Sequence, residues 1–151
     1  MQTAAATAKA PHHLGRAWFL LAAALALHVF DEASTGFLSV YNPTVAALRE
    51  RYAWFPMPQF EYRTWLAGLI IAVVVLVLLT PLAAANVRVI RPLGYLFAGI
   101  MLLNGIGHTA GTIAGRSVAS VHFARPMPGF YSSPLMIAAA IYLLVQLRRG
   151  A

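Results

Sequence analysis

The stretch Leu27-His28-Val29-Phe30-Asp31-Glu32 places two carboxylates deep in a segment that otherwise has the composition of a membrane span. The whole chain has 4 acidic residues, and two of them, Asp31 and Glu32, are adjacent here. Residues 17–27 before them are apolar without interruption. A carboxylate inside a bilayer costs roughly 2.5–3.5 kcal/mol on insertion scales, so we expect it to face the protein interior and to have a partner there.

The spacing of these residues places them together on one side of a helix. His28 and Glu32 are four residues apart and share a helical face, and Asp31 lies on the other side of His28. Three interpretations are open. The carboxylates mark the wetted outer end of a shorter span, they tie two helices together by hydrogen bonds, or they form a functional polar site. We favour the functional site.

Composition points to a membrane protein. The chain has 151 residues, of which 60% are hydrophobic and only 10% are charged, whereas an average soluble domain is about 25% charged. This composition predicts an all-α integral membrane protein that is large enough for one small helical bundle. The net charge of +7 comes mostly from arginines beside apolar segments, which suits lipid headgroups and argues against nucleic acid as a partner. The absence of cysteine excludes disulfides and cysteine-based metal sites.

The apolar segments predict a four-transmembrane-helix bundle. The expected spans are residues 17–40, 64–82, 93–113 and 132–147. Between the first two spans, Asn42-Pro43 is typical of a helix start, and the residues after it predict a short amphipathic helix lying at the membrane interface. We expect residues 1–16 to be a disordered tail, residues 148–151 to be a basic tail, and residues 117–131 to be a loop.

Four spans would put both termini on one side of the membrane. Basic residues are slightly more numerous on that side, six against five by our count of the 11 in the chain, which favours cytoplasmic termini. We therefore expect a bacterial inner-membrane protein surrounded by membrane lipids, with a small lipophilic substrate and no nucleic-acid partner. The oligomeric state stays open.

The third span carries the second half of the predicted site. Asn104 and His108 are four residues apart in this glycine-rich segment and share a face. The first and third spans run in the same direction, so this pair reaches the same depth as His28 and Glu32. We predict one joint site, with His28, Glu32 and His108 as metal ligands and with Asp31, Glu32 and Asn104 as catalytic residues.

These motifs resemble the HXXEE-domain membrane proteins, which are small helical proteins of undetermined function. The family pattern is His-x-x-Glu-Glu, a further histidine, and Tyr-x-Pro-Gly near the C-terminus. In this chain the matching residues are His28-Val29-Phe30-Asp31-Glu32, His108 and Pro128-Gly129. The chain departs from the pattern at Asp31, which replaces the first Glu, and at Pro126, which stands where Tyr is expected. The resemblance covers residues 17–147 and implies no established activity.

Three kinds of function follow from these residues. The first is an enzyme that acts on a small lipophilic substrate with a divalent metal, zinc, iron or manganese, because two histidines and one carboxylate are a common catalytic ligand set. The second is metal-free acid–base chemistry, as in an isomerase or cyclase of isoprenoid-like lipids. The third is non-enzymatic. It is either a proton-linked membrane protein or a haem held by His28 and His108, and the haem is less favoured because it leaves the two carboxylates without a role.

Overall fold

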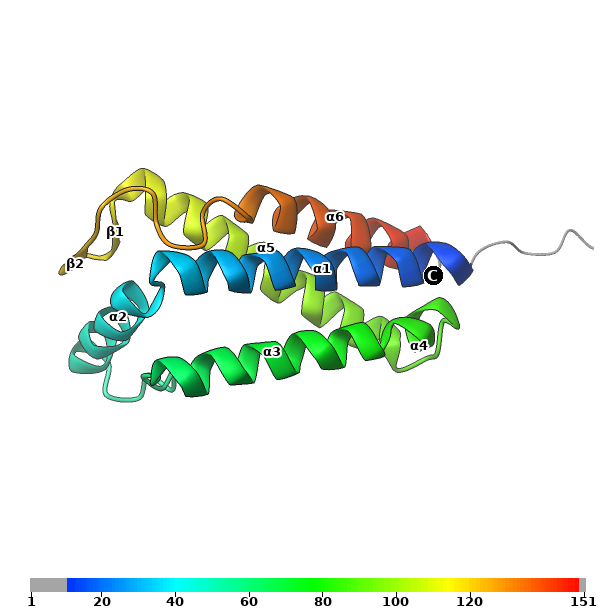
Figure 1. Ribbon diagram of the computed structural model, residues 1–151, viewed down its shortest axis with the longest axis horizontal. Helices are drawn as coiled ribbons and strands as arrows, with labels where there is room; N and C mark the ends of the chain where they lie inside the picture. The colour runs from blue at the N-terminus through cyan, green and yellow to red at the C-terminus, as the bar shows by residue number, and fades with distance from the viewer. Residues whose placement is uncertain (1–10, 150–151) are drawn as a thin grey trace, which may run out of the picture.

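The computed structural model describes residues 11–149 of the chain, and most of them are helical (Figure 1). The elements in chain order are α1 (Pro11–Thr35), α2 (Leu38–Arg51), α3 (Tyr62–Leu78), α4 (Thr80–Ala84), α5 (Ile90–Ala114), β1 (Arg116–Val118), β2 (Val121–His122) and α6 (Ser133–Arg149). The predicted helical class is confirmed. One departure is the short antiparallel hairpin of β1 and β2, which lies within the segment predicted as a loop except for its first residue, Arg116.

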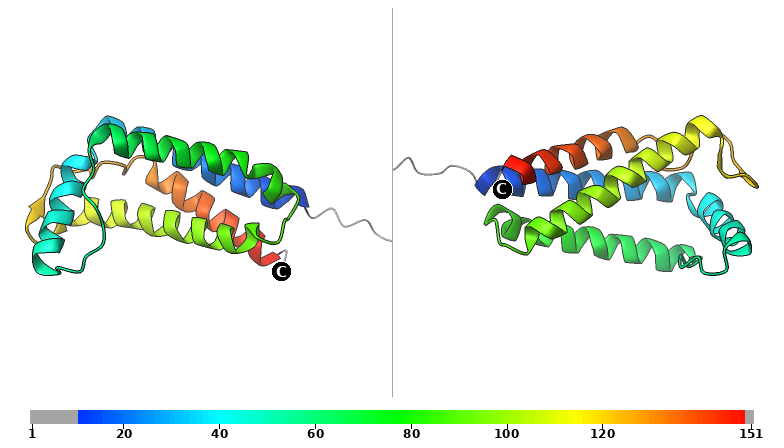
Figure 2. Two further views of the ribbon diagram at one scale, coloured as in Figure 1. Left: turned by 90° about the horizontal axis from the view of Figure 1, so that it is seen from below. Right: turned by 180° about the vertical axis from the view of Figure 1, so that it is seen from behind.

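The long helices run side by side along one axis (Figures 1 and 2). Helix α6 packs against α5 and α1, and α1 also packs against α3 and α4. Helix α2 and the hairpin lie at one end of the bundle, whereas the start of α1 and the end of α6 lie at the other (Figure 1). The core between the helices is apolar, and its largest buried side chains include Trp18, Leu21, Ile90, Met136, Leu143 and Leu147.

Three helical segments are long and apolar enough to cross a membrane: His13–Thr35, Tyr62–Ala84 and Ile90–Ala114. They correspond to the first three predicted spans. Helix α6 has 17 residues and is shorter than these three, so length and composition do not establish the fourth span. The least buried of the three segments is Tyr62–Ala84. It exposes Ile70, Ile71, Val74, Val75 and Leu78, an apolar surface of a kind that soluble monomers rarely present to water.

Helix α1 ends earlier than predicted, at Thr35 instead of residue 40. Gly36 adopts a left-handed conformation with φ of +78°, and the backbone N–H of Phe37 donates to the carbonyl of Glu32 at 3.0 Å. A left-handed glycine with this bond pattern is a common helix end. The prediction was wrong here because the apolar residues continue past Gly36 and hide the stop signal.

The ends of the chain also differ from the predicted tails. Helix α1 begins at Pro11, so residues 11–16 are helical and not disordered, and Leu14 is buried in the core. Proline is well tolerated in a first helical turn. The remainder of the predicted N-terminal tail lies outside the described residues. At the other end, Arg148 and Arg149 form the last turn of α6, so these two residues are not a separate tail.

Helix α2 begins at Leu38, and Asn42 does not cap it as predicted. Pro43 lies inside this helix. The amide of Asn42 instead binds the backbone of Phe60 twice: its Nδ2 donates to the Phe60 carbonyl at 2.9 Å, and its Oδ1 accepts from the Phe60 N–H at 3.0 Å. Asn42 therefore fixes the aromatic loop at residues 54–60 against α2.

A glycine at the contact between α1 and α4 allows a stability test. A Cβ at Gly15 would lie 2.7 Å from the Cβ and 2.9 Å from the Cα of Ala84. Because a backbone atom cannot move aside alone, Gly15→Ala should force these helices apart and lower the free energy of unfolding by about 1–3 kcal/mol. The control is Gly68→Ala on α3, where nothing lies within 4 Å and helix propensity favours alanine by about 1 kcal/mol. Denaturant unfolding followed by circular dichroism measures both, and equal stability of the two variants would contradict this packing.

Candidate metal centre

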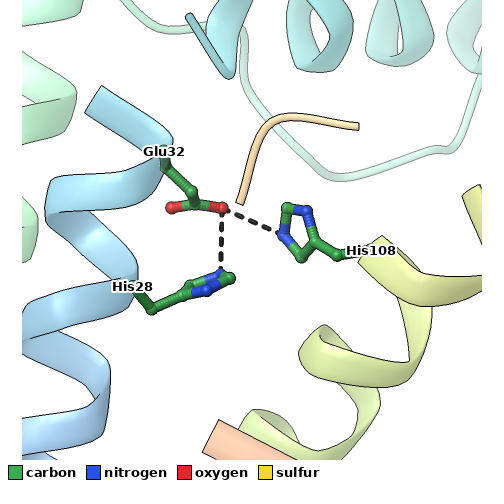
Figure 3. Close-up of side chains that lie close together, drawn as sticks. All are labelled: His28, Glu32 and His108. Carbon is green, nitrogen blue, oxygen red and sulfur yellow. Dashed lines mark ion pairs between the residues drawn. The ribbon is translucent and has the colours of Figure 1, made fainter. Parts of the chain in front are cut away.

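Two helices bring the three predicted metal ligands together. His28 and Glu32 project from the C-terminal half of α1, and His108 projects from α5 (Figure 3). The Nε2 of His28 lies 3.4 Å from the Oε1 of Glu32, and the Nε2 of His108 lies 3.1 Å from the same oxygen. Two imidazole nitrogens therefore converge on one carboxylate oxygen, so the three residues expected to form one site lie together in the bundle.

The cluster has the burial and the spacing of a metal site. His28, Glu32 and His108 expose 0%, 4% and 3% of their surfaces, and one ligand atom from each lies within 4.8 Å of the other two. Metal–ligand bonds of about 2.0–2.1 Å at tetrahedral angles place neighbouring ligand atoms about 3.3 Å apart. The two measured separations of 3.4 and 3.1 Å lie close to this value. The group could therefore hold a metal ion.

Ser132, the residue directly before α6, orients His28. The backbone N–H and the hydroxyl of Ser132 both donate to the Oδ2 of Asp31, at 2.9 and 2.8 Å. The Oγ of Ser132 also lies 2.8 Å from the Nδ1 of His28. A hydroxyl has one proton, and this proton is directed to Asp31, so the Nδ1 of His28 acts as the donor to Ser132. The chain Asp31–Ser132–His28 is thus of the kind that fixes the ring orientation of histidines in metal sites.

This hydrogen bond leaves the inner nitrogen of His28 free either to carry a second proton or to present a lone pair. The Nε2 atom is buried and has no hydrogen-bond partner among the described residues. It faces the Oε1 of Glu32 at 3.4 Å. Two lone pairs at this distance repel each other unless a cation or a proton lies between them. The arrangement therefore calls for a positive charge at the centre of the cluster.

The loop before α6 closes one side of the cluster. Gly129 has φ of +86°, and a Cβ at this position would lie 2.7 Å from the Cε1 of His108 and 3.0 Å from the Cγ of Glu32. The loop is held in place by Thr35, whose hydroxyl accepts from the Gly129 N–H at 3.3 Å, and by Ser133, whose hydroxyl donates to the Gly129 carbonyl at 2.7 Å. A glycine is needed here both for its backbone conformation and for its lack of a side chain.

The other predicted catalytic residues lie beside the cluster. Asp31 is buried on α1, but its Oδ2 binds Ser132 and it is not one of the three converging ligands. Asn104 lies one turn before His108 on α5, is half-buried, and lines a groove next to that histidine. The side chain of Asn104 makes no hydrogen bond to any residue that the structure describes. Its position suits contact with a ligand in the groove and not with the three-residue cluster.

The sequence analysis missed the residues that support the cluster from a distance in the chain. Ser132 and Ser133 were predicted only as the start of the fourth span, yet their hydroxyls bind His28, Asp31 and the loop. The Pro128-Gly129 motif could have indicated this contact. Glycine is the default residue where the backbone approaches a neighbouring segment closely.

No protein-family model matches the chain, and no curated protein and no solved structure is significantly similar to it. The chemistry of the cluster is therefore argued from its geometry.

The contact between the loop and the cluster predicts the effect of a substitution at Gly129. Gly129→Ala adds a Cβ that collides with His108 and Glu32 and strains a left-handed backbone. Gly36→Ala is a matched control, because Gly36 has φ of +78° but only Ser39 Oγ near its Cβ position, at 3.9 Å. Both variants should lose stability from backbone strain, and Gly129→Ala should lose about 1–3 kcal/mol more through overpacking. Equal losses in denaturant unfolding would show that Gly129 does not press on the cluster.

Proposed function

We propose that the protein is a membrane enzyme in which His28, Glu32 and His108 hold a divalent metal that acts on a small lipophilic substrate. The single observation that carries the proposal is the convergence of the buried Nε2 atoms of His28 and His108 on one oxygen of the Glu32 carboxylate. A buried charge or lone pair is tolerated when it is compensated. A divalent ion compensates all three groups at once.

The proposal includes a bundle that crosses the membrane four times. Helix α6 has 17 residues, which is at the lower limit of about 17–25 residues for a membrane span. The described chain begins and ends at the same end of the bundle (Figure 1), as an even number of crossings requires. We further propose a bacterial inner-membrane location with cytoplasmic termini, and membership of the HXXEE-domain proteins on the motifs at residues 28–32, 108 and 128–129.

Two imidazoles and one carboxylate leave coordination positions open. Such a set is used by catalytic zinc and by non-haem iron, and the bound metal supplies Lewis-acid chemistry or, with iron, redox chemistry. The residues of this chain would do the rest. Ser132 and Asp31 hold the Nδ1 proton of His28, which keeps its Nε2 available as a ligand. Gly129 and its loop exclude water from one side of the cluster.

A haem between the two histidines does not fit this arrangement. The rings of His28 and His108 are in edge contact, with centroids 4.7 Å apart and planes at 78°. Both inner nitrogens are directed at Glu32 instead of at opposite faces of a shared plane (Figure 3). A porphyrin has no space between rings that touch.

A second candidate is metal-free acid–base chemistry in the same cluster. Its support is the continuous polar chain from Asp31 through Ser132 and His28 to Glu32 and His108. A proton placed between the Nε2 of His28 and Glu32 would remove the lone-pair repulsion as a cation does. Buried carboxyl and imidazole groups in contact are suitable proton donors and acceptors. The metal content of the folded protein decides between the two candidates.

The metal proposal predicts stoichiometric binding that depends on the three ligands. Elemental analysis of protein purified in detergent without chelators should find about one zinc, iron or manganese ion per chain. His28→Ala, His108→Ala and Glu32→Gln should each lose most of this metal, because each removes one ligand of three. The matched control is His122→Ala, since His122 is an exposed histidine in the hairpin, and this variant should keep its metal.

The measurement needs a check that the protein is folded. A helical circular dichroism spectrum and a single peak in size-exclusion chromatography in detergent provide this check. Added metal should raise the melting temperature of the wild type but not of the ligand variants. A folded wild type that stays free of metal after incubation with zinc, ferrous iron and manganese would overturn the proposal in favour of acid–base chemistry.

Substitution of Ser132, which contacts His28 but is not itself a proposed ligand, should have a smaller effect on metal affinity than loss of a ligand. Ser132→Ala removes the acceptor for the Nδ1 of His28 and the hydroxyl that donates to Asp31. Loss of such an outer partner typically weakens metal affinity by about 10–100-fold while the ligands remain. A competition titration against a chromophoric chelator measures this, with Ser34→Ala as control because Ser34 bonds only to backbone carbonyls of α1. Unchanged affinity in Ser132→Ala would exclude the proposed orienting role.

A further inference from the structure

A groove leads from the end of the bundle to His108. It has a volume of about 430 Å³ and lies between α2, α5 and β1. Its walls are mostly apolar, with Phe37 and Val40 on one side and Gly107, Ala110 and Ala114 on the other. His108 is the one metal ligand of the proposed centre that lines it. Its volume lies in the lower part of the range for small-molecule sites, about 300–1,000 Å³.

The outer end of the groove is basic. Arg116, the first residue of β1, lines it, is exposed, and makes no ion pair with any acidic residue that the structure describes. Hydroxyl groups of Thr44 and Ser117 hydrogen-bond to each other at the same end. Burial raises the pKa of the Tyr41 phenol in the groove wall, so this group stays neutral and adds no negative charge. One end of the groove thus offers a cation and hydroxyls, and the remainder offers apolar surface.

We propose that this groove binds a single-chain amphiphile with an anionic head, placing the head at Arg116 and the chain against His108. The inference rests on the proposed function, because it takes the groove as the route by which a substrate reaches the metal ligands. A charged guanidinium at the mouth of an apolar groove is complementary to a carboxylate or phosphate that carries a hydrocarbon chain. The small volume fits one chain and not the two chains of a phospholipid.

The geometry also determines which part of the amphiphile would react. His108 lies about 9 Å along α5 from the helix end at Ala114, at about 1.5 Å per residue, and Arg116 lies beyond that end. A head held at Arg116 is therefore separated from the metal ligands by several carbon atoms. The substrate class is thus an anionic lipid that is modified within its chain and not at its head.

Two substitutions test the groove without touching the proposed ligands. Arg116→Gln removes the charge at the mouth. Gly107→Leu fills the groove, since nothing lies within 4 Å of a Cβ at this position. The matched controls are Arg63→Gln, at an exposed arginine of α3 outside the groove, and Gly99→Leu on α5, where nothing lies within 4 Å either. Binding of radiolabelled dodecanoate and dodecyl phosphate is measured on protein in phosphatidylcholine nanodiscs, with dodecanol and dodecyltrimethylammonium as competitors.

We expect each test variant to bind the anionic probes about tenfold or more weakly than the wild type, and each control to bind them normally. Neutral and cationic competitors should displace them poorly. Preference for dodecanoate or for dodecyl phosphate identifies the head as carboxylate or phosphate. Undiminished binding in both test variants, or equal competition by dodecanol, would overturn the proposal.

Metal content measured on the same samples separates this inference from the proposed function. Arg116→Gln and Gly107→Leu should keep their metal, because neither residue belongs to the cluster. A wild type that contains no metal but binds the anionic probes through Arg116 would refute the metal proposal and leave the groove assignment intact. A wild type that contains metal but does not bind the probes would refute the groove assignment alone.

Discussion

The buried carboxylate of Glu32, held between two imidazoles, is the constraint on which the structure around it depends. A carboxylate in an apolar bundle needs compensation from groups that cannot turn away from it. His28 provides one such group from the same helix face, and His108 provides the other from α5. His28 is in turn held by Ser132, and the carbonyl of Glu32 accepts the bond that ends α1 at Phe37. The C-terminal end of α1, the loop before α6 and the cluster of His28, Glu32 and His108 therefore depend on one another.

The loop before α6 covers one side of the cluster, and the groove beside α5 leaves another side open. A glycine makes each of these two features possible. Gly129 allows the loop before α6 to lie against His108 and Glu32 so closely that a methyl group would not fit. Gly107, one residue before His108, faces open space and leaves the groove beside α5 unfilled. A polar cluster that served only to join helices would have no need of such a difference. Access from one direction is what a site with a ligand requires.

Local patterns predicted the centre of the site, and contacts distant in sequence determined its surroundings. Spacing of four residues placed His28 and Glu32 together, and parallel spans of similar length placed His108 at their depth. The glycine at position 36 ends α1 early because its left-handed conformation outweighs the apolar residues after it. The bonds of Asn42 to Phe60 and of Ser132 to Asp31 join segments that no periodic pattern connects. Such pairings depend on the folded bundle, so only the structure reveals them.

Hydrogen bonding between helices, the simpler interpretation of the polar residues, explains part of the arrangement. Asp31 and Ser132 form a complete unit of this kind, since the carboxylate accepts both the N–H and the hydroxyl. The same unit commits the Nδ1 proton of His28 and directs its Nε2 at the Glu32 carboxylate. Purely structural polar groups in an apolar interior are normally satisfied. The contact between this nitrogen and the carboxylate needs a proton or a metal ion between them, so it serves the acid–base and the metal proposals alike.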